Sequence, residues 1–113
     1  MVASRVSAWL PVVAWALVIF ALSSIPSLGT GLGGWDLALR KIAHVLEYAI
    51  LGALLYRAAA HEAWSVALGA IYAASDEFHQ AFVPGRAGSI TDWVIDLGGV
   101  IIGVVAMRAW RKR

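Results

Sequence analysis

The stretch SDEFHQAFVPGRAGSITDWVIDLGGVIIG, Ser75 to Gly103, carries a dense set of ionisable residues directly between two apolar runs. In a chain this hydrophobic, such charges would have to lie at or inside a membrane boundary. A charge placed there is costly unless the side chain is paired or serves a function. The functional residues are therefore expected in and around this stretch.

The composition predicts a small integral membrane protein. The 113 residues are 61% hydrophobic and only 14% charged, and the mean hydropathy is +0.77. This leaves too little polar surface to cover a soluble globule of this size. The absence of cysteine excludes disulfides, redox thiols and thiolate metal sites. The net charge is only +2, with the basic excess in the C-terminal tail, which is typical of a membrane-topology signal and not of a nucleic-acid-binding surface.

Four segments predict membrane-spanning helices: residues 8–25, 38–60, 63–82 and 89–107. Asp36 is the expected N-cap of the second helix, Pro84-Gly85 the expected stop of the third, and Ser89-Ile-Thr-Asp92 an expected capping box for the fourth. We therefore expect an all-α fold, a four-helix membrane bundle that forms one domain over residues 1–113. The alternative for the first segment is a cleaved signal peptide, with Arg5 as its basic region and Ala21-Leu22-Ser23 as its cleavage site.

The distribution of charge predicts the orientation of these helices. Four spans put six of the nine basic residues on the side of both termini: Arg5, Arg57, Arg108, Arg111, Lys112 and Arg113. The positive-inside rule then places both termini in the cytoplasm. The same topology puts six of the seven acidic residues on the outer side: Asp36, Glu47, Asp76, Glu77, Asp92 and Asp96. At 1.5 Å per residue, Glu47, Asp76 and Asp96 would lie roughly 10 to 13 Å below the outer helix ends.

Helical spacing predicts that polar faces of three helices turn toward one another. These faces are Lys41, His44 and Tyr48, with Glu47 beside them, on the second helix; Tyr72, Asp76, His79 and Gln80 on the third; and Ser89, Asp92, Asp96, Gly99 and Gly103 on the fourth. The spacing Gly99-x-x-x-Gly103 would let a neighbouring helix approach closely. Because carboxylates that face lipid are costly, we predict a polar pocket in the outer half of the bundle, open to the extracytoplasmic side.

Three segments between Arg40 and Gly103 combine order and spacing in a specific way. They are Lys41-Ile-Ala-His44-Val-Leu-Glu47-Tyr48 followed by Leu51-Gly52; Ser75-Asp76-Glu77-Phe-His79-Gln80-Ala-Phe-Val-Pro84-Gly85-Arg86; and Asp92 and Asp96 through Gly99 to Gly103. This combination resembles the VanZ-like family. The resemblance implies a small multi-pass protein of the bacterial plasma membrane, and the founding member is associated with low-level resistance to the glycopeptide antibiotic teicoplanin. Asp96 stands where members of that family often have Asn, and the first helix carries no motif that can be aligned.

The first functional hypothesis is binding of a lipid-linked or cell-wall component in the polar pocket, with a resulting change in glycopeptide sensitivity. The candidate site residues are Lys41, His44, Glu47, Tyr48, Asp76, Glu77, His79, Gln80, Arg86, Asp92 and Asp96. Arg86 directly precedes a predicted helix N-terminus, where backbone N–H groups favour a phosphate or a carboxylate. Its alternative role is that of a counter-ion for Asp76 or Asp92.

The second hypothesis is a metal-dependent enzyme that cleaves or transfers a lipid-linked phosphate. A divalent metal would be held by His44, Glu47, Asp76, His79 and Asp92 and would activate water. The structural alternative is a buried charge network in which Lys41 and Arg86 neutralise the acids. A proton path through the acids and histidines is a further hypothesis, although no acid is predicted in the inner half of any span. The expected partners are membrane lipids and, for transport, further copies of the chain, but not nucleic acid.

Overall fold

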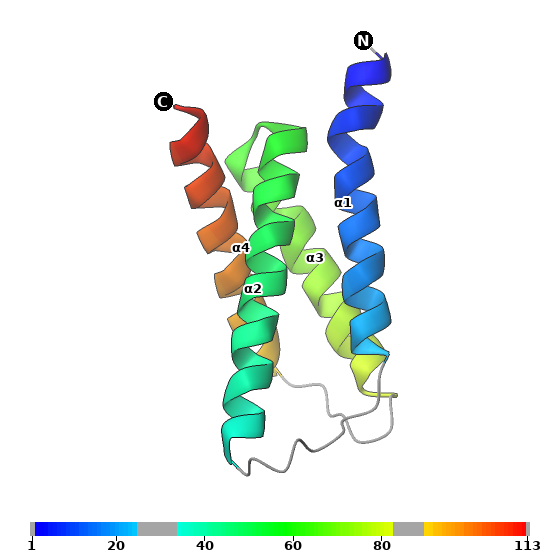
Figure 1. Cartoon of the computed structure of the whole chain (residues 1–113), viewed down its shortest axis with the longest axis vertical. Coiled ribbons are helices and arrows are strands. Elements are labelled where there is room, and N and C mark those ends of the chain that lie inside the picture. Colours follow the sequence, from blue (N-terminus) through cyan, green and yellow to red (C-terminus); the bar gives the residue numbers. More distant parts are fainter. Residues whose placement is uncertain (1, 25–33, 83–89, 113) are drawn as a thin grey trace.

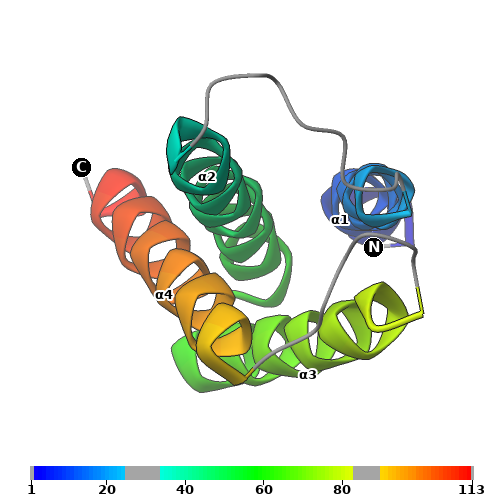
Figure 2. The ribbon, with the colours of Figure 1, turned by 90° about the horizontal axis from the view of Figure 1, so that it is seen from below.

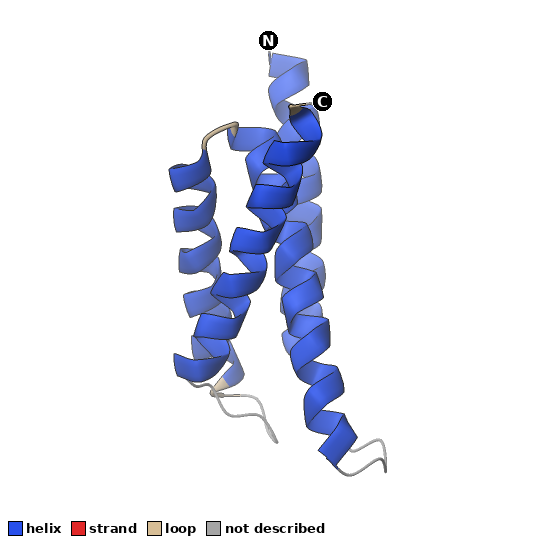
Figure 3. Ribbon diagram, turned by 90° about the vertical axis from the view of Figure 1, so that its left-hand side faces the viewer, coloured by secondary structure: helices blue, strands red, loops and turns tan. Residues whose placement is uncertain are grey.

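The computed structural model describes residues 2–24, 34–82 and 90–112, with side chains described for 5–24, 39–82 and 90–112. In these ranges the chain forms four helices: α1 (Val2–Ser23), α2 (Gly34–Ala59), α3 (Glu62–Gln80) and α4 (Ile90–Arg111). Short turns account for the remaining described residues, and these ranges hold no strand (Figure 3). The prediction of an all-α four-helix fold is confirmed.

Each of the four predicted segments corresponds to one helix, but the expected N-cap of the second helix is wrong. α1 begins at Val2, ahead of the predicted span of residues 8–25, so Pro11 lies inside the helix. α2 begins at Gly34, so Asp36 lies within the helix and is not its N-cap. The expected stop at Pro84-Gly85 and the capping residue Ser89 lie outside the described residues.

The four helices run alternately up and down along the long axis of the molecule (Figure 1). Both termini lie at one end together with the turn between α2 and α3, and α2 and α4 begin at the opposite end (Figure 1). The molecule measures 48 × 26 × 22 Å, so its long axis exceeds the ~30 Å thickness of a bilayer's hydrocarbon core.

The turn between α2 and α3 is made without glycine. Ala60 has a φ of 53°, in the left-handed region that non-glycine residues rarely adopt. His61 then caps α3, because its side chain accepts a hydrogen bond from the backbone N–H of Trp64 at 3.2 Å. Nothing in the apolar pattern indicated this histidine cap.

The distribution of polar and apolar side chains is that of a membrane protein. Leu10 and Phe78 are 62% and 70% exposed, whereas Asp76 and Asp96 are 3% and 0% exposed. Within the described ranges, three segments are long and apolar enough to cross a membrane: Arg5–Ser23 in α1, Leu39–Ala59 in α2 and Ile90–Arg111 in α4. The predicted span of residues 63–82 does not meet this measure, because the sequence of α3 contains several charged and polar residues, among them Asp76, Glu77 and Gln80.

Glycines bring α2 and α4 into backbone contact. A Cβ atom on Gly99 would lie 2.7 Å from the carbonyl oxygen of Val45, and one on Gly103 would overlap the carbonyl oxygen of Ala49. On the facing helix, a Cβ atom on Gly52 would overlap the backbone of Val100. The predicted close approach at Gly99-x-x-x-Gly103 is therefore confirmed, and α2 is the helix that approaches.

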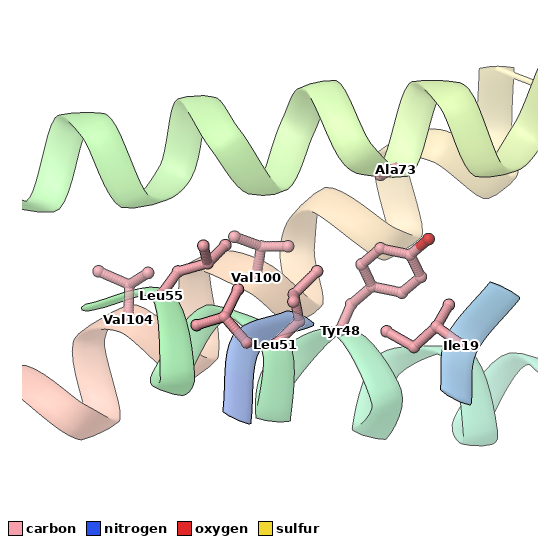
Figure 4. Packing of buried hydrophobic residues seen from close by; sticks show 8 residues of the cluster. Ile19, Tyr48, Leu51, Leu55, Ala73, Val100 and Val104 are labelled. Carbon is pink, nitrogen blue, oxygen red and sulfur yellow. The ribbon is translucent and has the colours of Figure 1, made fainter. Parts of the chain in front are cut away.

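A small apolar core lies between the helices, formed by Val12, Ile19, Tyr48, Leu51, Leu55, Ala73, Val100 and Val104. Tyr48 extends from α2 toward α3, with its ring in this core and its hydroxyl at the far end (Figure 4). α1 packs on α2 and α3 but, over the described residues, makes no contact with α4 (Figure 2). The centre of the molecule is thus α2, α3 and α4, with α1 attached at one side.

The glycine contacts predict that Gly103→Ala destabilises the protein. The added methyl group meets backbone atoms of Ala49 that cannot move aside, so we expect a loss of about 1–3 kcal/mol of unfolding free energy, measured by unfolding in detergent. Gly98→Ala is the matched control, because a Cβ atom there meets nothing within 4 Å. Equal stability of the two variants would contradict the assigned packing.

Candidate functional site

Two side-chain pairs join α2 to α4 in the half of the bundle remote from the termini. Lys41 Nζ lies 3.0 Å from Asp92 Oδ1, and His44 Nδ1 lies 3.1 Å from Asp96 Oδ1. The pairs are about one helical turn apart. Side-chain exposure falls from 39% and 33% in the Lys41–Asp92 pair to 18% and 1% in the His44–Asp96 pair. These pairs, which we call the α2–α4 ladder, therefore lead from the surface into the interior.

Below the ladder, Asp76 and Gln80 of α3 connect three helices. The hydroxyl of Tyr48 donates a hydrogen bond to Asp76 Oδ2 at 2.6 Å. The amide of Gln80 donates to the same oxygen at 3.3 Å and to Ser23 Oγ of α1 at 3.4 Å. The rings of His44 and Tyr48 stack at a centroid distance of 6.4 Å, which connects this group to the ladder. We call the ladder together with Ser23, Tyr48, Asp76 and Gln80 the polar cluster.

Two carboxylate oxygens in the polar cluster are buried without a hydrogen-bond partner among the described residues. They are Asp76 Oδ1 and Asp96 Oδ2. A buried acceptor left unsatisfied costs about 1–3 kcal/mol, and more if the group is charged. The Lys41–Asp92 pair of the predicted charge network is present at the cluster's edge. The part of that network assigned to Arg86 lies outside the described residues.

The remaining predicted site residues lie around the polar cluster. His79 faces α1, where Nε2 lies 2.9 Å from Ser24 Oγ and the ring stacks on Phe20 at 4.3 Å. Glu47 is half-buried and Glu77 is buried. Arg86 lies outside the described residues, so both hypotheses for it remain predictions.

Contacts that attach α1 to the bundle were not indicated by the sequence. The indole N–H of Trp15 donates to the backbone carbonyl of Glu47 at 2.8 Å, and the hydroxyl of Tyr72 donates to the carbonyl of Ala16. Trp93 of α4 likewise donates to the carbonyl of Ala70 on α3, at 3.0 Å. The available signal was the presence of aromatic N–H and O–H donors within apolar spans, since such donors need a partner there.

The five residues proposed as metal ligands do not come together. His44 pairs with Asp96, Asp92 pairs with Lys41, and His79 faces Ser24. In the part of the chain that the structure describes, no three His, Cys, Asp or Glu side chains are grouped so as to hold a metal ion. These residues do not fit a metal centre, and no metal-dependent reaction is assigned to them.

The chemical groups of the polar cluster change from its exposed edge to its buried end. A Lys–Asp ion pair stands at its partly exposed edge, an imidazole follows, and carboxylate oxygens form its buried end. Such an arrangement offers charged and hydrogen-bonding groups that can hold a polar group.

Comparison with models of known protein families gave a match. The VanZ/LLP1 family model matches residues 3–111. The chain belongs to the VanZ/LLP1 family. The resemblance seen between Arg40 and Gly103 is thereby confirmed, and membership extends to α1, where no motif could be aligned. No curated protein and no solved structure matched the chain.

The hydrogen bond between Tyr48 and Asp76 predicts that Tyr48→Phe destabilises this VanZ-family protein. The substitution preserves the ring in the core but removes a donor from a buried carboxylate, so we expect a loss of about 1–3 kcal/mol in detergent unfolding. Lys41→Ala is the comparison, since its part-exposed ion pair contributes about 0–1 kcal/mol. A larger loss for Lys41→Ala would show that the outer pair, not the Asp76 group, holds the helices together.

Proposed function

We propose that this VanZ-family protein binds a lipid-linked or cell-wall component through its polar cluster, at the outer face of the bacterial plasma membrane. Binding there alters the sensitivity of the cell to glycopeptide antibiotics such as teicoplanin. The observation that carries the proposal is the burial of Asp76 and Asp96, each with one carboxylate oxygen left without a hydrogen-bond partner among the described residues.

The energetics favour a functional origin for these acids. The polar cluster sits within helices that otherwise present apolar side chains to their surroundings. Replacing a buried ionic group by well-packed apolar residues is often neutral or stabilising. Packing alone therefore does not require Asp76 and Asp96, and ionisable residues inside spans commonly mark ligand or ion sites.

The proposed orientation puts the polar cluster on the side where wall precursors are displayed. At the opposite end of the bundle, basic residues near the termini have local partners: Arg108 Nε lies 2.7 Å from Glu62 Oε1, and Arg111 donates to the carbonyl of Arg57 at 3.0 Å. The positive-inside rule assigns this basic end to the cytoplasm. The ladder then begins at the extracytoplasmic surface.

The orientation can be tested with single cysteines, since the chain has none of its own. Ala81→Cys and Ala60→Cys lie at opposite ends of the bundle, and both positions are exposed. We expect a membrane-impermeant maleimide added to intact cells to label Ala81→Cys and not Ala60→Cys, and both variants to be labelled after lysis. The reverse pattern would place the polar cluster in the cytoplasm and overturn the proposal.

The function itself is tested by expression in a teicoplanin-susceptible bacterium. We expect the wild-type chain to raise the inhibitory concentration of teicoplanin, and Asp76→Asn and Asp96→Asn to return it to that of the empty vector. Glu62→Gln is the matched control, because it removes an exposed acid at the opposite end. Membrane levels of all variants are compared by immunoblot. An unchanged inhibitory concentration with the abundant wild-type protein would rule out the antibiotic effect.

A further inference from the structure

The two unpartnered oxygens of the polar cluster belong to one place in the fold. Asp76 and Asp96 come from α3 and α4, and each contacts one of two stacked rings of α2: the hydroxyl of Tyr48 donates to Asp76 Oδ2 at 2.6 Å, and His44 Nδ1 lies 3.1 Å from Asp96 Oδ1. Both side chains are more than nine-tenths buried. Asp76 Oδ1 and Asp96 Oδ2 are therefore buried hydrogen-bond acceptors beside the stacked rings of Tyr48 and His44.

Among the described contacts of Asp76 and Asp96, the charge balance is negative. The ammonium of Lys41 is engaged by Asp92 at the surface, and His44 is engaged by the other oxygen of Asp96. The two hydrogen bonds that Asp76 accepts come from neutral groups, the phenol of Tyr48 and the amide of Gln80. A phosphate or carboxylate brought here would meet like charge, whereas a cationic hydrogen-bond donor would be attracted.

The chemistry of the two carboxylate acceptors limits which cations could bind between them. Zn²⁺ and Ca²⁺ sites use more protein ligands than this part of the described chain brings together. A primary ammonium needs none of that coordination geometry, because it is a compact charge with N–H donors that can turn toward whichever acceptors are present. Two carboxylate oxygens match two of its donors.

The α2–α4 ladder would lead an ammonium to this end, because carboxylates also line it. Asp92 already holds one primary ammonium, that of Lys41, at 3.0 Å on the part-exposed edge. Asp96 lies one turn deeper on the same face of α4. An incoming ammonium would thus pass from one carboxylate to the next.

We infer that the inner end of the polar cluster binds a primary ammonium group, held between Asp76 Oδ1 and Asp96 Oδ2. This inference rests on the proposed function and names the chemistry of its ligand: the part recognised deepest in the protein is an amine and not a phosphate. Such an amine is present in aminated lipid headgroups and in the peptides of wall precursors.

The test uses the purified full-length chain in detergent with methylammonium chloride as the probe. Tetramethylammonium chloride at the same concentrations is the control ion, because it carries the same charge without an N–H donor. We expect methylammonium to raise the Tm saturably, by about 3 °C or more, and tetramethylammonium to leave it unchanged. Equal shifts with both salts, or no shift with either, would overturn the inference without any variant being needed.

Variants locate the site. Asp76→Asn and Asp96→Asn should each lose the methylammonium shift, while Glu62→Gln should retain it. Circular dichroism and gel filtration establish that each variant is folded before it is compared. A methylammonium shift that survives in both folded Asn variants would place the ammonium elsewhere and overturn the assignment.

Vesicles then distinguish the two sources of the amine. Phosphatidylethanolamine and phosphatidylcholine carry the same net charge, but only the first has N–H donors. A higher Tm in phosphatidylethanolamine that disappears in Asp96→Asn assigns the ammonium to a lipid headgroup. Equal Tm in both lipids, with the methylammonium shift intact, assigns it to a wall component. The teicoplanin measurement is independent, so loss of the antibiotic effect alone would leave the ammonium site standing.

Discussion

Carboxylates cannot face the hydrocarbon core of a membrane, and the arrangement of this bundle depends on that constraint. Asp76 and Asp96 turn inward, and the helices that carry them must therefore meet. The glycines of α2 and α4 allow this, because they bring the two backbones close enough for His44 to reach Asp96. Apolar side chains occupy the outer surface instead, which reverses the distribution of a soluble protein.

The same constraint explains the composition of α3. It is the least apolar of the four helices because small and polar residues fill its inner face: Ser65, Gly69, Ala73, Asp76, Glu77 and Gln80. Gly69 accommodates the side chain of Val100, so α3 can also lie close to α4. A helix that supplies the buried end of the polar cluster cannot also be uniformly hydrophobic.

The sequence predicted the features that depend on the spacing of residues along a helix. The four helices, the close approach at Gly99 and Gly103, and the joining of the polar faces around His44, Tyr48, Asp76 and Asp96 all follow from periodicity and from the cost of charge in lipid. Helix starts were less predictable, since α1 and α2 extend through residues that neither favour nor forbid a helix.

The residues of the proposed metal set lie apart in the described structure, and helix geometry explains part of this. Seen down the helix axis, the residue three positions after Asp76 lies about 60° to one side of it, and the residue four positions after it lies about 40° to the other side. His79 thus turns from Asp76 toward α1, whereas Gln80 stays with Asp76. The acceptors that attach α1 were not predictable, because Trp15 and Tyr72 donate to backbone carbonyls, and every residue has such an acceptor.

The backbone contact between α2 and α4 also has a dynamic consequence. Two helices that touch through glycine and carbonyl groups cannot slide or rotate past each other without collision. A rearrangement that the proposed ligand required would then involve α1, which makes no contact with α4 over the described residues, and not the α2–α4 pair. The helix pair that carries the ladder is thus the fixed frame against which α1 and α3 pack.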